Sequence, residues 1–154
     1  MFIKIENTLK NFFPGKKIDK NYSKIKKTYR LLIFEDDIKT LSVLINRLRR
    51  LEESFKNEVL AITVFAEYEQ IKDYVNKSST DFDLIILDRD CRACGSFYVL
   101  DFKKLNLDKI ISVSSAPERN EEAKARGIKN IIFKDLNNLD KFAEKVVEEI
   151  QKMV

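Results

Sequence analysis

Short apolar runs recur along the chain, and longer segments with a different spacing of apolar residues lie between them. The runs cover residues 31–34, 59–65, 84–87, 110–113 and 131–133. A short apolar run bounded by polar residues is typical of a strand that is buried on both faces of a sheet. The sequence therefore predicts five strands. The third, 84–87, is unbroken and leads directly into Asp88.

The segments between the runs predict helices. Apolar residues recur every three or four positions after the first run and predict a helix from Ile38 to about Glu53. Further helices are predicted around residues 71–75, from Ser96 through Leu100 to Phe102-Lys103, from Pro117 to Gly127, and over residues 139–150. Strands that alternate with helices favour a parallel sheet. We therefore predict a doubly wound, three-layer α/β fold with the flavodoxin-like strand order 2-1-3-4-5.

The charge distribution divides the chain into two parts. Residues 1–28 contain eight lysines against Glu6 and Asp19, a net charge of +6, whereas the remaining residues carry −2. We interpret residues 1–28 as a basic extension and residues 29–154 as one domain. In the extension, Phe2, Ile5, Leu9 and Phe12 have helical spacing. We expect these side chains to pack on the domain or on a partner, and not on nucleic acid.

Membrane insertion and a cysteine-based site are both disfavoured. No apolar run approaches the roughly 18 residues that a membrane span needs, and the N-terminus lacks the features of a signal peptide. We therefore expect a cytoplasmic protein. Cys91 and Cys94 could form a redox pair, but two thiols without any histidine are too few for a usual zinc site. We expect them to be reduced and dispensable.

Polar groups follow four of the five predicted strands: Glu35-Asp36 the first, Asp88 the third, Ser114 or Ser115 the fourth, and Lys134 the fifth. The carboxyl ends of parallel strands share one edge of the sheet, so these groups are expected to converge. Close carboxylates repel one another, and Mg²⁺ relieves that repulsion.

Asp88 could then attack phosphorus as a carboxylate nucleophile, while Mg²⁺, Lys134 and a serine hydroxyl contact the phosphoryl oxygens. Each group alone also has a structural explanation, such as an aspartate that caps a helix or acids that favour a helix N-terminus. The joint arrangement favours phosphoryl transfer.

Four segments make the sequence similar to the receiver domain of two-component response regulators, from about Tyr29 to the C-terminus. They are Leu-Leu-Ile-Phe-Glu-Asp-Asp, Asp-Leu-Ile-Ile-Leu-Asp, Ile-Ile-Ser-Val-Ser-Ser and Ile-Ile-Phe-Lys, in this order. The resemblance implies that Asp88 accepts phosphate from a histidine kinase or a phosphotransfer protein. It also implies that Glu35, Asp36, Asp88 and the backbone carbonyl of Asp90 bind Mg²⁺.

In the same family pattern, Ser114 is the switch hydroxyl, with Ser115 as the alternative, and Lys134 pairs with the phosphoryl group. We expect a single-domain regulator, with no output domain after Val154, that signals through protein–protein contacts. A homodimer is compatible with this expectation. Direct binding of nucleic acid or membrane is not expected, nor is enzymatic turnover beyond self-catalysed phosphorylation and dephosphorylation.

Three positions depart from the family pattern. Asp135 replaces the usual proline after the lysine, Ile131 replaces the aromatic switch residue, and the segment from Cys91 to Cys94 replaces the usual Met-Pro. These departures favour one alternative, a degenerate receiver that binds partners without being phosphorylated.

A second alternative is a phosphatase similar to the haloacid dehalogenases, because the apolar run followed by Asp88-Arg89-Asp90 fits their nucleophile motif. That motif should lie on the first strand, and no acidic pair follows Lys134. Asp90 is the rival nucleophile, but strand alternation sets it one pleat further out than Asp88.

Overall fold

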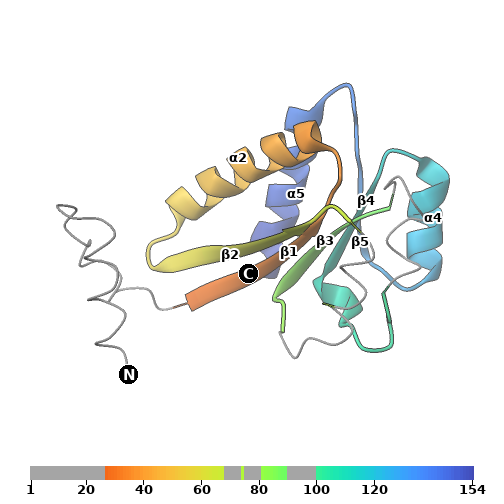
Figure 1. Cartoon of the computed structure of the whole chain (residues 1–154), viewed down its shortest axis with the longest axis horizontal. Coiled ribbons are helices and arrows are strands. Elements are labelled where there is room, and N and C mark those ends of the chain that lie inside the picture. The colour runs from red at the N-terminus through yellow and green to blue at the C-terminus, as the bar shows by residue number, and fades with distance from the viewer. Residues whose placement is uncertain (1–26, 68–73, 75–80, 90–99) are drawn as a thin grey trace.

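The computed structural model describes residues 27–67, 74, 81–89 and 100–154. Five strands and three α-helices alternate in this part of the chain (Figure 1). In order they are β1 (Lys27–Phe34), α2 (Ile38–Ser54), β2 (Glu58–Phe65), β3 (Leu84–Asp88), the short 3₁₀ helix η3 (Leu107–Lys109), β4 (Ile110–Ser114), α4 (Pro117–Ala125), β5 (Asn130–Phe133) and α5 (Leu139–Met153). None of the helices in these ranges is long and apolar enough to cross a membrane.

The strands form one parallel sheet with the order β2-β1-β3-β4-β5. The predicted flavodoxin-like order is therefore confirmed. The order reverses between β1 and β3, since the chain adds β2 on one side of β1 and β3 on the other. In folds of this kind, ligands bind beyond the carboxyl ends of the strands at such a reversal.

Apolar side chains cover both faces of the sheet, as unbroken apolar runs predict. On one face, α2 and α5 pack over Leu31, Ile33, Leu84 and Ile86. On the other face, α4 contributes Ala123 to a cluster around the remaining apolar residues of β1 and β3. All five residues of β3 and all five of β4 are buried, so these strands form the centre of the domain.

The helix boundaries follow from local hydrogen bonds. α2 begins where the side chain of Asp37 accepts a hydrogen bond from the N–H of Thr40, at 2.7 Å. α4 ends at Ala125, and Gly127, two residues later, has a φ of 91°. The N–H of Gly127 donates to the carbonyl of Lys124, and the N–H of Ile128 donates to that of Ala123. This is the paired arrangement of a Schellman motif, and the predicted helix stop at Gly127 is confirmed.

Two predictions about individual elements need correction. The helix expected to continue through Leu100 and Phe102-Lys103 is absent there, and these residues form a bend and a turn. The carboxylate of Asp101 accepts a hydrogen bond from the N–H of Lys103, and its carbonyl accepts one from the N–H of Lys104. An aspartate that binds nearby N–H groups in this way stabilises a turn at the expense of a helix.

The second correction concerns β1, which begins at Lys27 and not at residue 31. Its first four residues pair in register with β2, where Lys27 lies opposite Glu58. The start of the predicted helix at Ser96 lies outside the described residues. Of the predicted helix around residues 71–75, only Tyr74 is described, and it is helical.

Candidate functional site

The candidate site lies at the carboxyl edge of the sheet, where three strand ends are held by backbone hydrogen bonds. The N–H of Glu35 donates to the carbonyl of Phe65 at 3.2 Å. The N–H of Arg89 donates to Val113 at 2.9 Å, and the N–H of Lys134 donates to Ser114 at 2.8 Å. Each bond extends the pairing of the strands past the end of β1, β3 or β5. Backbone hydrogen bonds alone therefore fix the chain at the ends of these three strands.

The side chain of Lys134 contacts the carboxylates at the ends of β1 and β3. Its Nζ atom lies 2.6 Å from Oδ2 of Asp88 and 3.4 Å from Oε2 of Glu35. All three side chains are buried. Burial lowers the pKa of Lys134, but the two carboxylates raise it more, so its net pKa lies above the ordinary value. The ammonium is therefore charged, and its contact with Asp88 is a short, charge-assisted hydrogen bond.

The surroundings of Glu35 favour the protonated form of its carboxyl group. Its side chain is 2% exposed. Burial and then the neighbouring Asp88 carboxylate raise the pKa of Glu35 to about 8, against the lowering effects of Lys134 and of the Asp37 N–H. The Asp37 N–H lies 3.0 Å from Oε1 of Glu35. Burial and the nearby Asp88 therefore disfavour a second ionised carboxylate beside Lys134 in the absence of a metal ion.

Glu35, Asp36 and Asp88 have the chemistry of a metal site. One carboxylate oxygen from each lies within 4.8 Å of the other two. Carboxylates that converge in this way suit hard divalent cations such as Mg²⁺, and the raised pKa of Glu35 indicates repulsion that a cation would relieve. The residues present therefore fit a divalent cation.

Asp37 has a separate task, although it directly follows Asp36. Its carboxylate caps α2, and the Thr40 N–H lowers the pKa of Asp37. The three consecutive acids are thus divided between the site, which takes Glu35 and Asp36, and the helix start. The sequence analysis placed Glu35 and Asp36 in the site but did not assign the helix cap to Asp37.

Ser114 lies between the two strands that carry Asp88 and Lys134. It ends β4 and is fully buried. Its Oγ atom accepts a hydrogen bond from the N–H of Ala116 at 3.0 Å and donates one to the carbonyl of Ala116 at 3.1 Å. These bonds hold the hydroxyl in the loop that leads into α4. Ser115 is half-buried.

Arg89 is a buried residue that the sequence analysis did not identify. It directly follows Asp88 and is 3% exposed. Its Nη2 atom donates to Oε2 of Glu122 on α4 at 3.0 Å. Arginine is rarely buried, so only the three-dimensional structure could reveal this contact. Asp90, Cys91 and Cys94 lie outside the described residues.

Comparison with solved structures identifies the fold. The phosphorylated cyanobacterial phytochrome response regulator RcpA matches with a TM-score of 0.63 at 15% identity, over 81% of this chain and 92% of that one. A response regulator from Hahella chejuensis matches with a TM-score of 0.61 at 18% identity, over 82% and 95%. TrrA from Thermotoga maritima, solved with Mg²⁺ and BeF, matches with a TM-score of 0.57 at 17% identity, over 82% and 99%.

These matches agree with the strand order and show that the chain has the fold of response regulator receiver domains. No protein-family model matches the chain, and no curated protein matches it significantly.

Proposed function

We propose that this chain acts as a receiver in two-component signalling and that Asp88 accepts a phosphoryl group from a histidine kinase or a phosphotransfer protein. The main support is the position of Lys134, whose ammonium lies 2.6 Å from Asp88 and 3.4 Å from Glu35 at the carboxyl edge of the sheet. A fixed cation beside a carboxylate nucleophile stabilises the charge of an incoming phosphoryl group.

In the proposed reaction, a carboxylate oxygen of Asp88 attacks the phosphorus atom of a phosphohistidine. The new oxygen–phosphorus bond forms as the phosphorus–nitrogen bond breaks, and the imidazole nitrogen leaves with the electron pair. Lys134 remains protonated and contacts the phosphoryl oxygens. Water later hydrolyses the acyl phosphate and restores the carboxylate of Asp88. The protein thus changes state but does not turn over a separate substrate.

Glu35, Asp36 and Asp88 are the side chains that would hold Mg²⁺, together with the backbone carbonyl of Asp90. When bound, Mg²⁺ neutralises part of the charge on the transferring group. The raised pKa of Glu35 supports this ligand set, because burial and then the nearby Asp88 carboxylate disfavour its ionised form, which a bound cation would favour.

We assign the switch hydroxyl to Ser114, with Ser115 as the alternative. The support is the burial of Ser114 at the end of β4, between the strands of Asp88 and Lys134. Ile131 is partly buried on the α4 side of the sheet and has no aromatic ring to rotate. Asp135 accepts a hydrogen bond from the N–H of Asn137 at 3.0 Å, in the turn that follows Lys134.

The proposed signal therefore passes to a protein partner without an aromatic switch. In this proposal the protein works in the cytoplasm without direct contact to nucleic acid or membrane.

The competing function is a receiver that binds its partner without phosphorylation. Beryllofluoride with Mg²⁺ imitates an acyl phosphate and separates the two cases. We expect it to shift the amide NMR signals around Asp88 and Ser114 in the wild-type protein and to leave those of Asp88→Asn unchanged. An unchanged wild-type spectrum would favour the phosphorylation-independent module.

A phosphatase of the haloacid dehalogenase type is disfavoured by topology. Its nucleophile belongs on the first strand, whereas Asp88 ends β3. We expect no hydrolysis of a generic phosphomonoester. Hydrolysis that is lost in Asp88→Asn would restore this alternative.

A further inference from the structure

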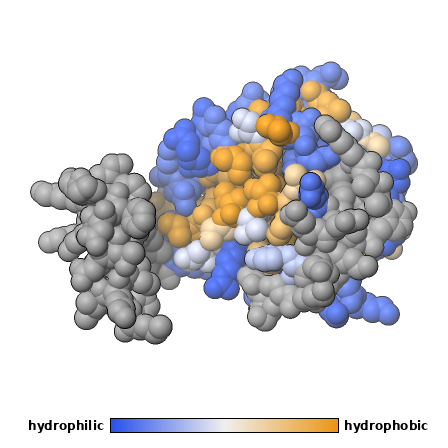
Figure 2. All heavy atoms as spheres, viewed as in Figure 1, coloured by the Kyte–Doolittle hydropathy of each residue, from blue (hydrophilic) through white to orange (hydrophobic). Residues whose placement is uncertain are grey.

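An apolar surface lies along α2 and the edge strand β2, and it begins at Ile38, directly after the acids at residues 35–37. It consists of Ile38, Leu41 and Ile45 on α2 and of Leu60, Ile62 and Val64 on β2, and we name it the α2–β2 surface. Ile38 is 83% exposed and Val64 is 37% exposed. Figure 2 shows hydrophobic side chains gathered between these two elements on the face turned to the viewer.

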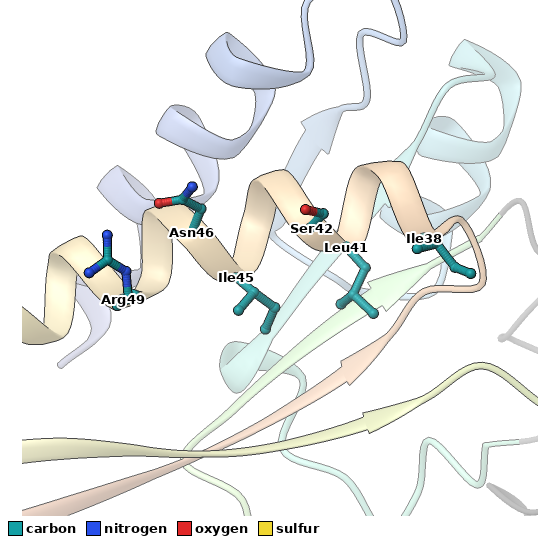
Figure 3. Close-up of a pocket in the computed structure, with 6 residues that line it drawn as sticks. All are labelled: Ile38, Leu41, Ser42, Ile45, Asn46 and Arg49. Carbon is teal, nitrogen blue, oxygen red and sulfur yellow. The ribbon is translucent and has the colours of Figure 1, made fainter.

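A shallow groove of about 390 Å³ follows this side of α2. It is lined by Ile38, Leu41, Ser42, Ile45, Asn46 and Arg49. The three apolar side chains stand in a row on the side of the helix that is turned toward the strands (Figure 3). These residues are three and four positions apart. Apolar side chains with this spacing form a stripe against which the apolar face of a second helix can pack.

The edge strand β2 gives a second reason to expect that another chain segment packs on the α2–β2 surface. It is an edge strand of eight residues, and none of them is fully buried. Glu58 is its only charged residue. A long, apolar edge strand without lysine or proline tends to attract another chain unless something covers it.

We propose that residues 1–13 of this chain form an amphipathic helix that docks on the α2–β2 surface of the same molecule. The apolar residues Phe2, Ile5, Leu9 and Phe12 share one face of such a helix. A helix from residue 2 to 13 is ~18 Å long, which is about the length of α2 between Ile38 and Arg49. Pro14-Gly15 would end this helix.

The position of β1 sets where residues 1–26 join the domain. β1 begins at Lys27, which lies opposite Glu58 at the start of the edge strand. The chain therefore enters the sheet one strand away from β2. Residues 14–26 span at most ~45 Å, which exceeds the ~25 Å length of α2. A tether of this length raises the effective concentration of the helix to roughly millimolar, so even a weak contact is populated.

Residues 1–13 and α2 both carry a small net positive charge, so charge does not drive this docking. Residues 1–13 contain Lys4 and Lys10 against Glu6, and most of the basic charge of the extension follows Pro14. On α2, Arg47 and Arg49 already form ion pairs with Asp140 and Glu53. The contact is therefore mainly apolar. It goes beyond the proposed function and does not depend on phosphorylation.

The test uses NMR spectra of the full chain. Leu9→Glu places a charge on the apolar face of the extension, and Asn7→Glu places the same charge on the opposite face. We expect Leu9→Glu to shift the amide signals of the α2–β2 surface and Asn7→Glu to leave them unchanged. Equal effects of the two variants, or no shift with Leu9→Glu, would overturn the proposal.

The reverse experiment alters the surface. Ile38→Ser should move the signals of residues 1–13 toward random-coil positions, because the helix loses its docking partner. Leu136→Ser is the matched control, since Leu136 is 55% exposed outside the α2–β2 surface. Neither effect should change on dilution. If the wild-type signals of the surface move on dilution and the protein becomes smaller by light scattering, the occupant is a second copy and the proposal is wrong.

Discussion

Lys134 places one positive charge between two buried carboxylates, and this imbalance defines the candidate site. Its ammonium lies 2.6 Å from Asp88 and 3.4 Å from Glu35, while Asp36 adds a third acid to the cluster. Burial, and after it the neighbouring Asp88 carboxylate, raises the pKa of Glu35 to about 8. Without metal, Glu35 therefore keeps a proton near neutral pH. A divalent cation would displace that proton.

The stability of the metal-free protein should consequently depend on Glu35 and pH. In the unfolded chain Glu35 loses its proton near pH 4.5, whereas in the folded protein it holds the proton until about pH 8. The folded state binds more protons between these values, so its contribution to the free energy of unfolding falls as pH rises, by at most about 1.4 kcal/mol per pH unit. Urea unfolding in EDTA at several pH values measures this slope.

Glu35→Gln is the matched variant, because the amide oxygen can still accept the hydrogen bond from the Asp37 N–H. We expect its free energy of unfolding to fall less steeply over the same pH range. Added Mg²⁺ should reduce the slope of the wild type, since it favours the ionised carboxyl group. If Glu35→Gln and wild type have the same slope in EDTA, the negative charge does not accumulate at Glu35.

Removing the charge of Asp36 and removing that of Asp37 should change the Mg²⁺ affinity by different amounts. Asp36→Asn removes a ligand charge and should weaken Mg²⁺ binding by about tenfold or more, or ~1.4 kcal/mol. Asp37→Asn should retain the wild-type affinity, because asparagine caps a helix as well as aspartate does. Calorimetric titration with Mg²⁺ compares the two variants. Equal losses of affinity, or no loss in Asp36→Asn, would place the metal elsewhere.

Residue types and their order were enough to predict which side chains meet, but not that Asp37 caps α2. Glu35, Asp88 and Lys134 each follow an apolar run, and parallel strands bring such positions to one edge. The separate use of Asp36 and Asp37 depends on which carboxylate reaches the Thr40 N–H. That distance is a property of the folded turn and leaves no pattern in the sequence.

Among the elements, α4 is held to the sheet by few buried side chains. Only Asn120 and Ala123 are buried in this nine-residue helix. The contact between Arg89 and Glu122 therefore has particular weight, because it ties α4 to the residue that follows Asp88. Glu122 is also within 3.2 Å of Arg126 and 3.8 Å of Arg119. Burial raises the pKa of Glu122, but its hydrogen bonds to Arg89 and Arg126 lower it more.

Glu122→Gln should loosen α4 selectively. Losing the charge beside the buried Arg89 should weaken the attachment of α4 to the sheet by about 1 kcal/mol. Amide exchange in α4 should then be roughly fivefold faster. Exchange in α5 should not change. Hydrogen–deuterium exchange by mass spectrometry measures both helices in one experiment.

Glu121→Gln is the control for this prediction. Glu121 is exposed and pairs only at the surface with Lys124 within α4, at 2.6 Å. Such a pair contributes little to stability. If α4 exchanges equally fast in both variants, the contact with Arg89 does not hold the helix.

The elements with strong periodicity were predicted well, and those that depend on local competition were not. β3 follows from an unbroken apolar run, β4 from a run that only Ser112 interrupts, and α2 and α5 from helical spacing. The turn at residues 101–104 was predicted as helix, because apolar spacing does not reveal that Asp101 captures nearby N–H groups. The early start of β1 was missed because its first residues are polar and gain strand structure only by pairing with β2.

The whole molecule brings together groups that are far apart in the sequence. Glu35 and Lys134 are separated by 99 positions, yet their side chains lie 3.4 Å apart. Only the order of the parallel strands creates this proximity, so the fold is the cause of the site. The fold by itself does not identify the nucleophile. We assign it to Asp88 because its carboxylate lies beside Lys134, and a chemical experiment tests this assignment.

The decisive measurement is the intact mass of the protein after incubation with acetyl phosphate and Mg²⁺. The proposal predicts that the wild type gains one phosphoryl group, that base removes it as it removes an acyl phosphate, and that Asp88→Asn gains none because an amide is a poor nucleophile. Asp90→Asn, two residues away, should still be phosphorylated. A protein that remains unmodified, or an Asp88→Asn variant that is phosphorylated as fully as the wild type while Asp90→Asn is not, would contradict the proposal.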